Sequence, residues 1–169
     1  MLEMALFLGI VLVVFLNNIK HKLLQSKNYF LVFLMGFFTT LPHELAHYIV
    51  ALILGGRPFG LYLFPKKVEA GGYIHWTFGS VNAYVNSFNG FFIGIAPIIW
   101  LVIGYFVAKY YFYYVDVSFF SVILFFLIEW ILIENGLPSK TDLDIAFSSS
   151  VGVIIFFISV IGIILLLRS

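Results

Sequence analysis

Residues 41–48 read Leu-Pro-His-Glu-Leu-Ala-His-Tyr and lie inside a long apolar segment. The motif His-Glu-x-x-His places His43 and His47 on one face of a helix, one turn apart. Two imidazoles in this arrangement can share a zinc ion, and Glu44 projects beside them, where it can take a proton from water. The motif therefore predicts a zinc-dependent hydrolytic site, with the two histidines as metal ligands and Glu44 as the catalytic base.

The composition indicates an integral membrane protein. Of 169 residues, 63% are hydrophobic and 10% are charged, whereas soluble domains are about a quarter charged. Three ionisable groups within five residues are costly in hydrocarbon, which favours a bound metal over a chance match. The net charge of +1 implies no nucleic-acid partner. Because the chain has no cysteine, a metal must be held by His, Asp, Glu or water.

Segment lengths predict an all-α, multi-pass protein of the cell membrane, a single membrane-embedded domain over 1–169 with about five transmembrane helices. The lipid bilayer is thus an expected partner. We expect the first span to be retained, because no positive charge precedes it and no small-residue cleavage site follows it. The expected spans are residues 2–16, 29–54, 89–108, 118–135 and 148–167.

Residues 57–87 predict a short interfacial β-hairpin after the second span. Segments 61–64 and 73–78 are rich in β-formers, and the intervening 65–72 carries turn signals. An exposed strand edge in this region could pair with an extended peptide, although the segment could also be a loop that covers the helix ends. His75 could be a further ligand, but its place beside Trp76 favours an interfacial role.

Several residues within the spans have two interpretations. Pro42 removes a backbone donor, which predicts either a local opening beside the metal or an ordinary kink. Gly90 and Gly94 form a small-x-x-x-small pair that lets another helix approach closely. Three asparagines could bind a substrate backbone, but loop and capping roles are favoured: Asn82, Asn86 and Asn89.

A third metal ligand is expected from the turn at residues 138–144. Successive spans alternate in direction, so this turn and the two histidines reach the same side of the membrane. Either Asp142 or Asp144 could then complete a site that leaves the fourth zinc position open to water. Ser139 and Asp142 also fit a helix-capping pair, which is compatible with a metal role for the second carboxylate oxygen. Two carboxylates of the fourth span could also contribute: Glu129 and Glu134.

The run from His43 to His47, with Gly55 eight residues on, resembles the first motif of the site-2 protease family of intramembrane zinc metalloproteases. The resemblance covers residues 29–145. It includes the hairpin, the segment 94–97 and a later aspartate that follows Asn135 and Pro138. The usual Leu-Asp-Gly is absent, since Leu143 follows the first aspartate.

This resemblance implies zinc held by His43, His47 and Asp142, with Glu44 as the catalytic residue. The Pro-Ser-x-x-Asp run favours Asp142 over Asp144, because it is similar to that of small, divergent members. The implied activity is endopeptidase cleavage of membrane-embedded protein or peptide substrates.

Two other functions use the same residues. One is a zinc-dependent membrane hydrolase of a lipid or small amide, and the other is a non-catalytic membrane protein whose histidine pair binds or transports metal. Substrate identity, oligomeric state and regulation are left open by these patterns. Basic residues are nearly balanced between the two sides, so charge does not assign the orientation, and the resemblance places the hairpin in the cytoplasm.

Overall fold

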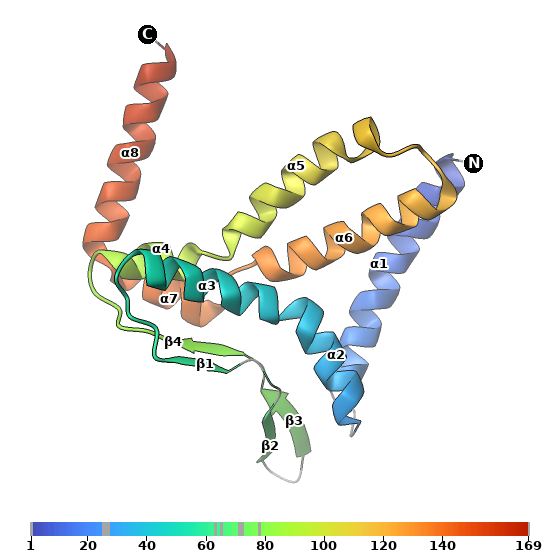
Figure 1. The fold of residues 1–169 in the computed structure, drawn as a ribbon, viewed down its shortest axis with the longest axis horizontal. Coiled ribbons are helices and arrows are strands. Elements are labelled where there is room, and N and C mark those ends of the chain that lie inside the picture. The colour runs from blue at the N-terminus through green and yellow to red at the C-terminus, as the bar shows by residue number, and fades with distance from the viewer. Residues whose placement is uncertain are drawn as a thin grey trace.

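The computed structural model is mostly helical, with small β-sheets beside the third helix (Figure 1). It describes residues 2–24, 28–62, 64, 66–70, 73–77 and 79–168. Within these residues the helices are α1 (Leu2–Leu24), α2 (Tyr29–Thr39), α3 (Leu41–Ile53), α4 (Asn89–Ile95), α5 (Ile98–Tyr114), α6 (Phe119–Gly136), α7 (Lys140–Ser148) and α8 (Ser150–Arg168). The strands are β1 (Gly60–Tyr62), β2 (Lys66–Ala70), β3 (Tyr73–Thr77) and β4 (Ser80–Asn82).

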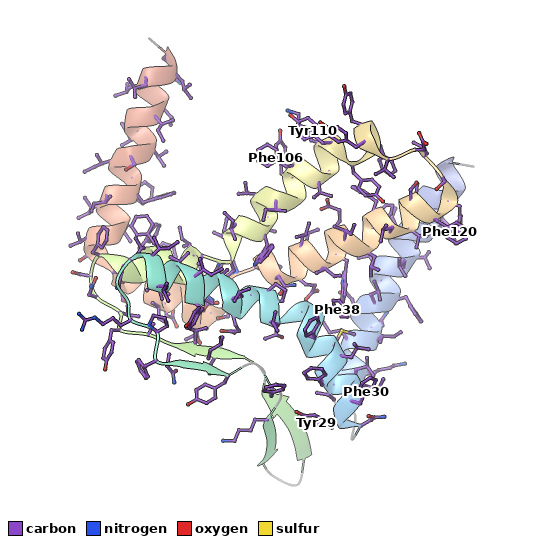
Figure 2. The ribbon with its side chains drawn as sticks, viewed as in Figure 1. Tyr29, Phe30, Phe38, Phe106, Tyr110 and Phe120 are labelled. Atoms are coloured by element: carbon purple, nitrogen blue, oxygen red, sulfur yellow. The ribbon has the colours of Figure 1, made fainter. Side chains whose placement is uncertain are left out.

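Several helices are suited to a membrane. Among the described residues, α6 and α8 are each long and apolar enough to cross one, and the number rises to four if the bent pairs α2–α3 and α4–α5 each count as one span. The expected spans at 118–135 and 148–167 correspond to α6 and α8. Helix α1 continues to Leu24, beyond the expected end at residue 16. Large apolar side chains such as Phe30, Phe106 and Phe120 are exposed on the helices (Figure 2).

Each of two predicted spans is divided into two helices; an opening or kink was predicted at Pro42, whereas none was predicted near Pro97. Residues 29–54 break at Thr40 into α2 and α3, which are bent by 48°. Residues 89–108 break near Pro97 into α4 and α5, bent by 46°. A proline lies at or just after each break. Since proline cannot donate the backbone hydrogen bond that continues a helix, it interrupts the helix there. Pro42 sits in the first turn of α3, where its missing N–H is tolerated.

The segment between α3 and α4 forms two antiparallel strand pairs, β1–β4 and β2–β3. The expected first strand overlaps β1. The expected turn over 65–72 was wrong in part, since Lys66–Ala70 form β2 and pair with β3. Strand preference depends strongly on cross-strand partners, and β3 supplies them here. The remaining turn residues 71–72 lie outside the described residues.

Helix α7 packs closely on α4 through glycines. A Cβ at Gly94 would collide with the Asp142 carbonyl oxygen and lie 2.8 Å from the Ala146 Cβ, and a Cβ at Gly90 would collide with Ser149. The close approach expected at these glycines is thus confirmed, and the partner is α7 together with the residue that follows it. Residues 140–144 were expected as part of a turn but begin this helix, because Ser139 and Asp142 cap its first turn.

Candidate metal centre

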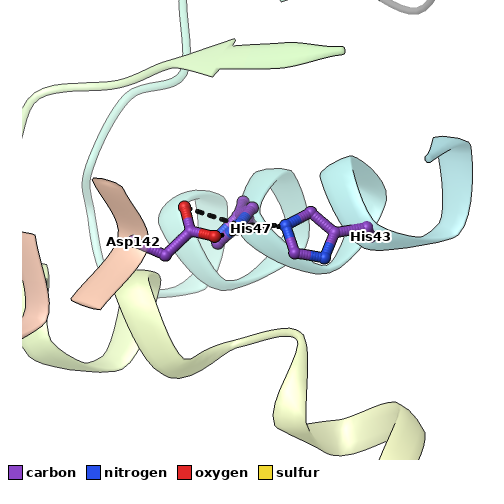
Figure 3. A group of neighbouring side chains, drawn as sticks. All are labelled: His43, His47 and Asp142. Carbon is purple, nitrogen blue, oxygen red and sulfur yellow. Dashed lines mark hydrogen bonds and ion pairs between the residues drawn. The ribbon is translucent and has the colours of Figure 1, made fainter. Parts of the chain in front are cut away.

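Three of the predicted site residues come together between α3 and α7 (Figure 3). His43 Nε2 lies 3.2 Å from Asp142 Oδ2, and His47 Nε2 lies 3.2 Å from Asp142 Oδ1. The two Nε2 atoms are also 3.2 Å apart. One ligand atom from each residue can be chosen so that all lie within 4.8 Å of one another, so the group could hold a metal ion.

The first turn of α7 fixes the Asp142 carboxylate. The Asp142 N–H donates to Ser139 Oγ at 3.2 Å, and the Ser139 N–H donates to Asp142 Oδ2 at 2.7 Å. This reciprocal capping box confirms the predicted Ser-x-x-Asp pair. The Asp142 carboxylate can cap α7 and contact both histidines at once. Its Oδ1 faces His47, while its Oδ2 accepts from the Ser139 N–H and faces His43.

Backbone carbonyl groups set the orientation of both imidazoles. His43 Nδ1 lies 3.0 Å from the Asn135 carbonyl oxygen, and His47 Nδ1 lies 2.6 Å from the Ile93 carbonyl oxygen. A carbonyl oxygen only accepts hydrogen bonds, so each Nδ1 carries the hydrogen and donates it. Each Nε2 is therefore left toward Asp142. Metal-binding histidines are held by outer partners in this way.

Both carbonyl groups are available because a helix is interrupted beside them. Pro97 has no N–H, so the Ile93 carbonyl accepts from the Ala96 N–H, three residues later, at 3.2 Å, and it also accepts from the His47 ring. Helix α6 ends at Gly136, which leaves the Asn135 carbonyl among the unpaired groups of a helix C-terminus. Ser139, four residues after Asn135, gives its N–H to Asp142 instead.

The Asn135 side chain fills the break between α2 and α3. It is fully buried, its Oδ1 accepts from the His43 N–H at 3.1 Å, and its Nδ2 donates to the Phe38 carbonyl at 2.7 Å. Pro42 cannot donate to Phe38, so Asn135 supplies the missing hydrogen bond. The sequence reasoning noted Asn135 only through the family resemblance and missed this role. The sequence did contain a signal for this role: a polar amide at the end of an apolar helix needs buried hydrogen-bond partners.

The Asp142 carboxyl is surrounded by groups that favour its charged form. Burial alone would raise the pKa of its carboxyl, but His43, His47 and Ser139 outweigh burial and hold the pKa well below its usual range. For each imidazole to hydrogen-bond the carboxylate, a hydrogen must lie between Nε2 and the facing oxygen, and a bound metal cation would replace these hydrogens. Two imidazoles and one carboxylate form a donor set that suits divalent transition metals.

Glu44 lines a cavity of about 410 Å³ beside the group, together with His47 and Asp142. The cavity is also lined by β4 and by Gly79 just before it. Gly79, with φ of 40°, approaches closely: a Cβ there would lie 2.5 Å from Glu44 Cγ. The sequence reasoning missed Gly79. A glycine at this position lets the strand segment pack directly against Glu44.

The other predicted candidates lie apart from this group. Asp144 is exposed and does not belong to the metal-binding group found among the described residues. Glu134 forms an ion pair with Lys20 of α1. Glu129 faces α5, where a Cβ at Gly104 would lie 3.2 Å from its Oε2. In the described part of the chain, Glu129 Oε1 has no hydrogen-bond partner.

Two of the three asparagines have the predicted loop and capping roles, whereas Asn82 lies in strand β4. Asn86 accepts from the Phe88 and Asn89 N–H groups at 2.9 Å, and Asn89 accepts from the Asn86 N–H at 2.8 Å, so their loop and capping roles are confirmed. The ligand role considered for His75 stays a prediction, because its side chain lies outside the described part of the structure.

Comparison with known proteins identifies no relative of this chain. No family model, no curated protein and no solved structure matches the chain. The fold and the site together define a helical chain with membrane-compatible spans and a His–His–Asp group that could bind metal. A function is therefore argued from the site itself.

Proposed function

We propose that this chain is a multi-pass, zinc-dependent intramembrane endopeptidase similar to the site-2 protease family. One observation carries the proposal: His43 and His47 each have Nδ1 committed to a backbone carbonyl, so both Nε2 atoms converge on Asp142 beside Glu44. Two imidazoles and one carboxylate match a catalytic zinc site, because they leave a fourth position for water or substrate.

The residues divide the chemistry among them. Bound zinc would polarise the peptide carbonyl and lower the pKa of water at the open position. Glu44 accepts a proton from the attacking water and returns it to the departing amine, so that one peptide bond and one water yield a carboxylate and an amine. Asn135 and Ile93 keep the two rings oriented throughout.

The β4 strand supports a peptide as the substrate. β4 pairs with β1 on one edge, and its other edge has no strand neighbour among the described residues. Residues 79–83 line the cavity that contains Glu44. A peptide that added to this edge would extend between β4 and the first turn of α7. A locally unwound segment of a membrane-embedded substrate fits this arrangement better than a lipid tail.

The decisive variant is Glu44→Gln. Cleavage of a single-span model protein in liposomes should fall by about 10²–10⁴-fold, the usual contribution of a general base, while bound zinc stays at the wild-type level. Cleavage at the wild-type rate would show that Glu44 is not the base. Lipid and small-amide substrates are assayed in parallel. Hydrolysis of these alone would support a lipid or amide hydrolase, and zinc binding without any hydrolysis would support a non-catalytic role.

The third ligand is tested with a matched pair of aspartates. Asp142→Ala should lose zinc, because it removes the carboxylate that faces both imidazoles. Asp144→Ala should keep zinc, because this exposed side chain stands outside the group. Metal analysis of both purified variants against wild type gives the answer. Full zinc content in Asp142→Ala would refute the assignment.

A further inference from the structure

Among the described side chains, helix α1 makes two polar contacts with α6. Lys20 forms an ion pair with Glu134, and Asn17 Oδ1 accepts a hydrogen bond from Trp130 Nε1 at 2.7 Å. The two α1 residues are three apart and their partners are four apart, so each pair lies on one face of its helix. Polar side chains in two apolar helices thus meet at the same contact.

The last turns of α6 connect this contact to the candidate metal centre. Glu134 is followed directly by Asn135, which binds the His43 N–H and supplies the carbonyl that accepts from the His43 ring. Successive residues on a helix are about 100° apart around the axis. A rotation of α6 that separated Glu134 from Lys20 would therefore also move Asn135 away from His43.

We propose that Lys20 and Asn17 are positioning residues for the metal centre: they fix the rotation of α6 and so hold Asn135 against His43. The inference rests on the metal centre of the proposed function and extends it to α1, which lies outside residues 29–145. The side chains of Lys20 and Glu134 are only 24% and 20% exposed. Removing one partner leaves the other charge poorly compensated, which favours a rearrangement of α6.

The first test compares Lys20→Met with Lys22→Met in the full chain, reconstituted in lipid nanodiscs. Lys22 lies on the same helix and is exposed, so it controls for the loss of a lysine. Chelator competition gives the zinc dissociation constant, and the absorption spectrum of the cobalt-substituted protein reports ligand geometry. Lys20→Met should weaken zinc binding by about tenfold, as changes behind metal ligands do, and alter the cobalt spectrum. Lys22→Met should change neither.

Restoring the contact should restore the centre. Lys20→Arg and the exchange Lys20→Glu with Glu134→Lys should return the zinc affinity and the cobalt spectrum toward wild type. Trp130→Phe keeps the aromatic ring but removes the N–H that reaches Asn17, so it should weaken zinc binding in the same direction by less. This variant also carries the test if Lys20→Met fails to fold.

The outcomes separate this inference from the proposed activity. A lower melting temperature in Lys20→Met, with unchanged zinc affinity and cobalt spectrum, would reduce the contact to a structural one and overturn the inference. Unchanged affinity in Trp130→Phe would do the same if that variant carries the test. A chain that follows the expected zinc pattern but cleaves no peptide would refute the endopeptidase and leave the inference standing. A wild-type chain that binds no zinc would refute both.

Discussion

The two bent helix pairs, α2–α3 and α4–α5, each break beside a proline, but the carbonyl groups at the two breaks have different hydrogen-bond partners. In each, a proline leaves a carbonyl without its helical donor: Phe38 in the α2–α3 pair and Ile93 in the α4–α5 pair. The Phe38 carbonyl accepts from the Asn135 side chain, whereas the Ile93 carbonyl accepts from the ring of His47. An apolar environment offers little water to such groups. One break is therefore closed by a structural amide, and the other directly orients a candidate ligand.

The backbone differs between the two breaks as well. Thr40 departs from helical geometry, with φ of −132° and ψ of −41°. Ala96 and Pro97 remain in the right-handed helical region, with φ of −50° and −58°. Both breaks bend the chain by similar angles, 48° and 46°. At the first, a residue with non-helical geometry is accompanied by an inserted side chain, whereas at the second the backbone stays helical and only the N–H of Pro97 is missing.

The largest effect is expected at the first break, from Asn135→Ala. The change leaves the buried Phe38 carbonyl and His43 N–H unpaired, which should lower the free energy of unfolding by about 2–5 kcal/mol. Zinc binding should weaken by about 100-fold, because the turn that carries His43 loses its support. Denaturant unfolding and chelator competition measure the two effects. Asn18→Ala is the control, since Asn18 is exposed on α1 and bonds only locally to Val14 in the described contacts.

The next largest loss of zinc affinity is expected from Gly94→Ala, because this change disturbs α4 on the side that faces Asp142. The added methyl would collide with the Asp142 carbonyl and push α7 outward, so zinc binding should weaken by about 30-fold. Gly162→Ala in α8 is the matched control, because a Cβ there meets nothing within 4 Å. Equal zinc affinities in the two variants would show that the α4–α7 approach does not place the carboxylate.

The smallest effects should come from the prolines, and they test the comparison most directly. Pro97→Ala restores an N–H that can compete with His47 for the Ile93 carbonyl, so zinc binding should weaken by about tenfold. Pro42→Ala should change it less, because the distorted Thr40 keeps the new N–H from replacing Asn135. Both are measured by chelator competition. A larger effect at Pro42 than at Pro97 would contradict the different uses assigned to the two breaks.

Local patterns predicted most of the candidate site. The spacing of His43 and His47 needs only one helical turn, and the capping pair at Ser139 and Asp142 needs only the start of a helix. Both are short-range features, and both appear in the structure. Counting spans was sufficient to place the later aspartates near the histidines, but it left Asp142 and Asp144 equivalent. The family resemblance favoured Asp142, and the position of α7 places Asp142 beside the histidines.

Features that depend on distant partners were not predictable in this way. The break at Thr40 is stabilised by Asn135, more than 90 residues away in the chain, so Pro42 alone could not distinguish an opening from a kink. β2 was read as part of a turn because its strand character depends on pairing with β3. The close approach of Gly79 to Glu44 likewise exists only once the strands fold over α3.

The oxygen that steadies His47 belongs to the main chain and not to a side chain. Every amino acid placed at position 93 would present the same atom, so a substitution scan would report on the buried Ile93 side chain and would miss what its carbonyl contributes. Replacing the amide that follows Ile93 with an ester, which weakens that oxygen as an acceptor, would reveal it. Part of the support of this centre thus comes from the main chain, where side-chain substitutions cannot remove it.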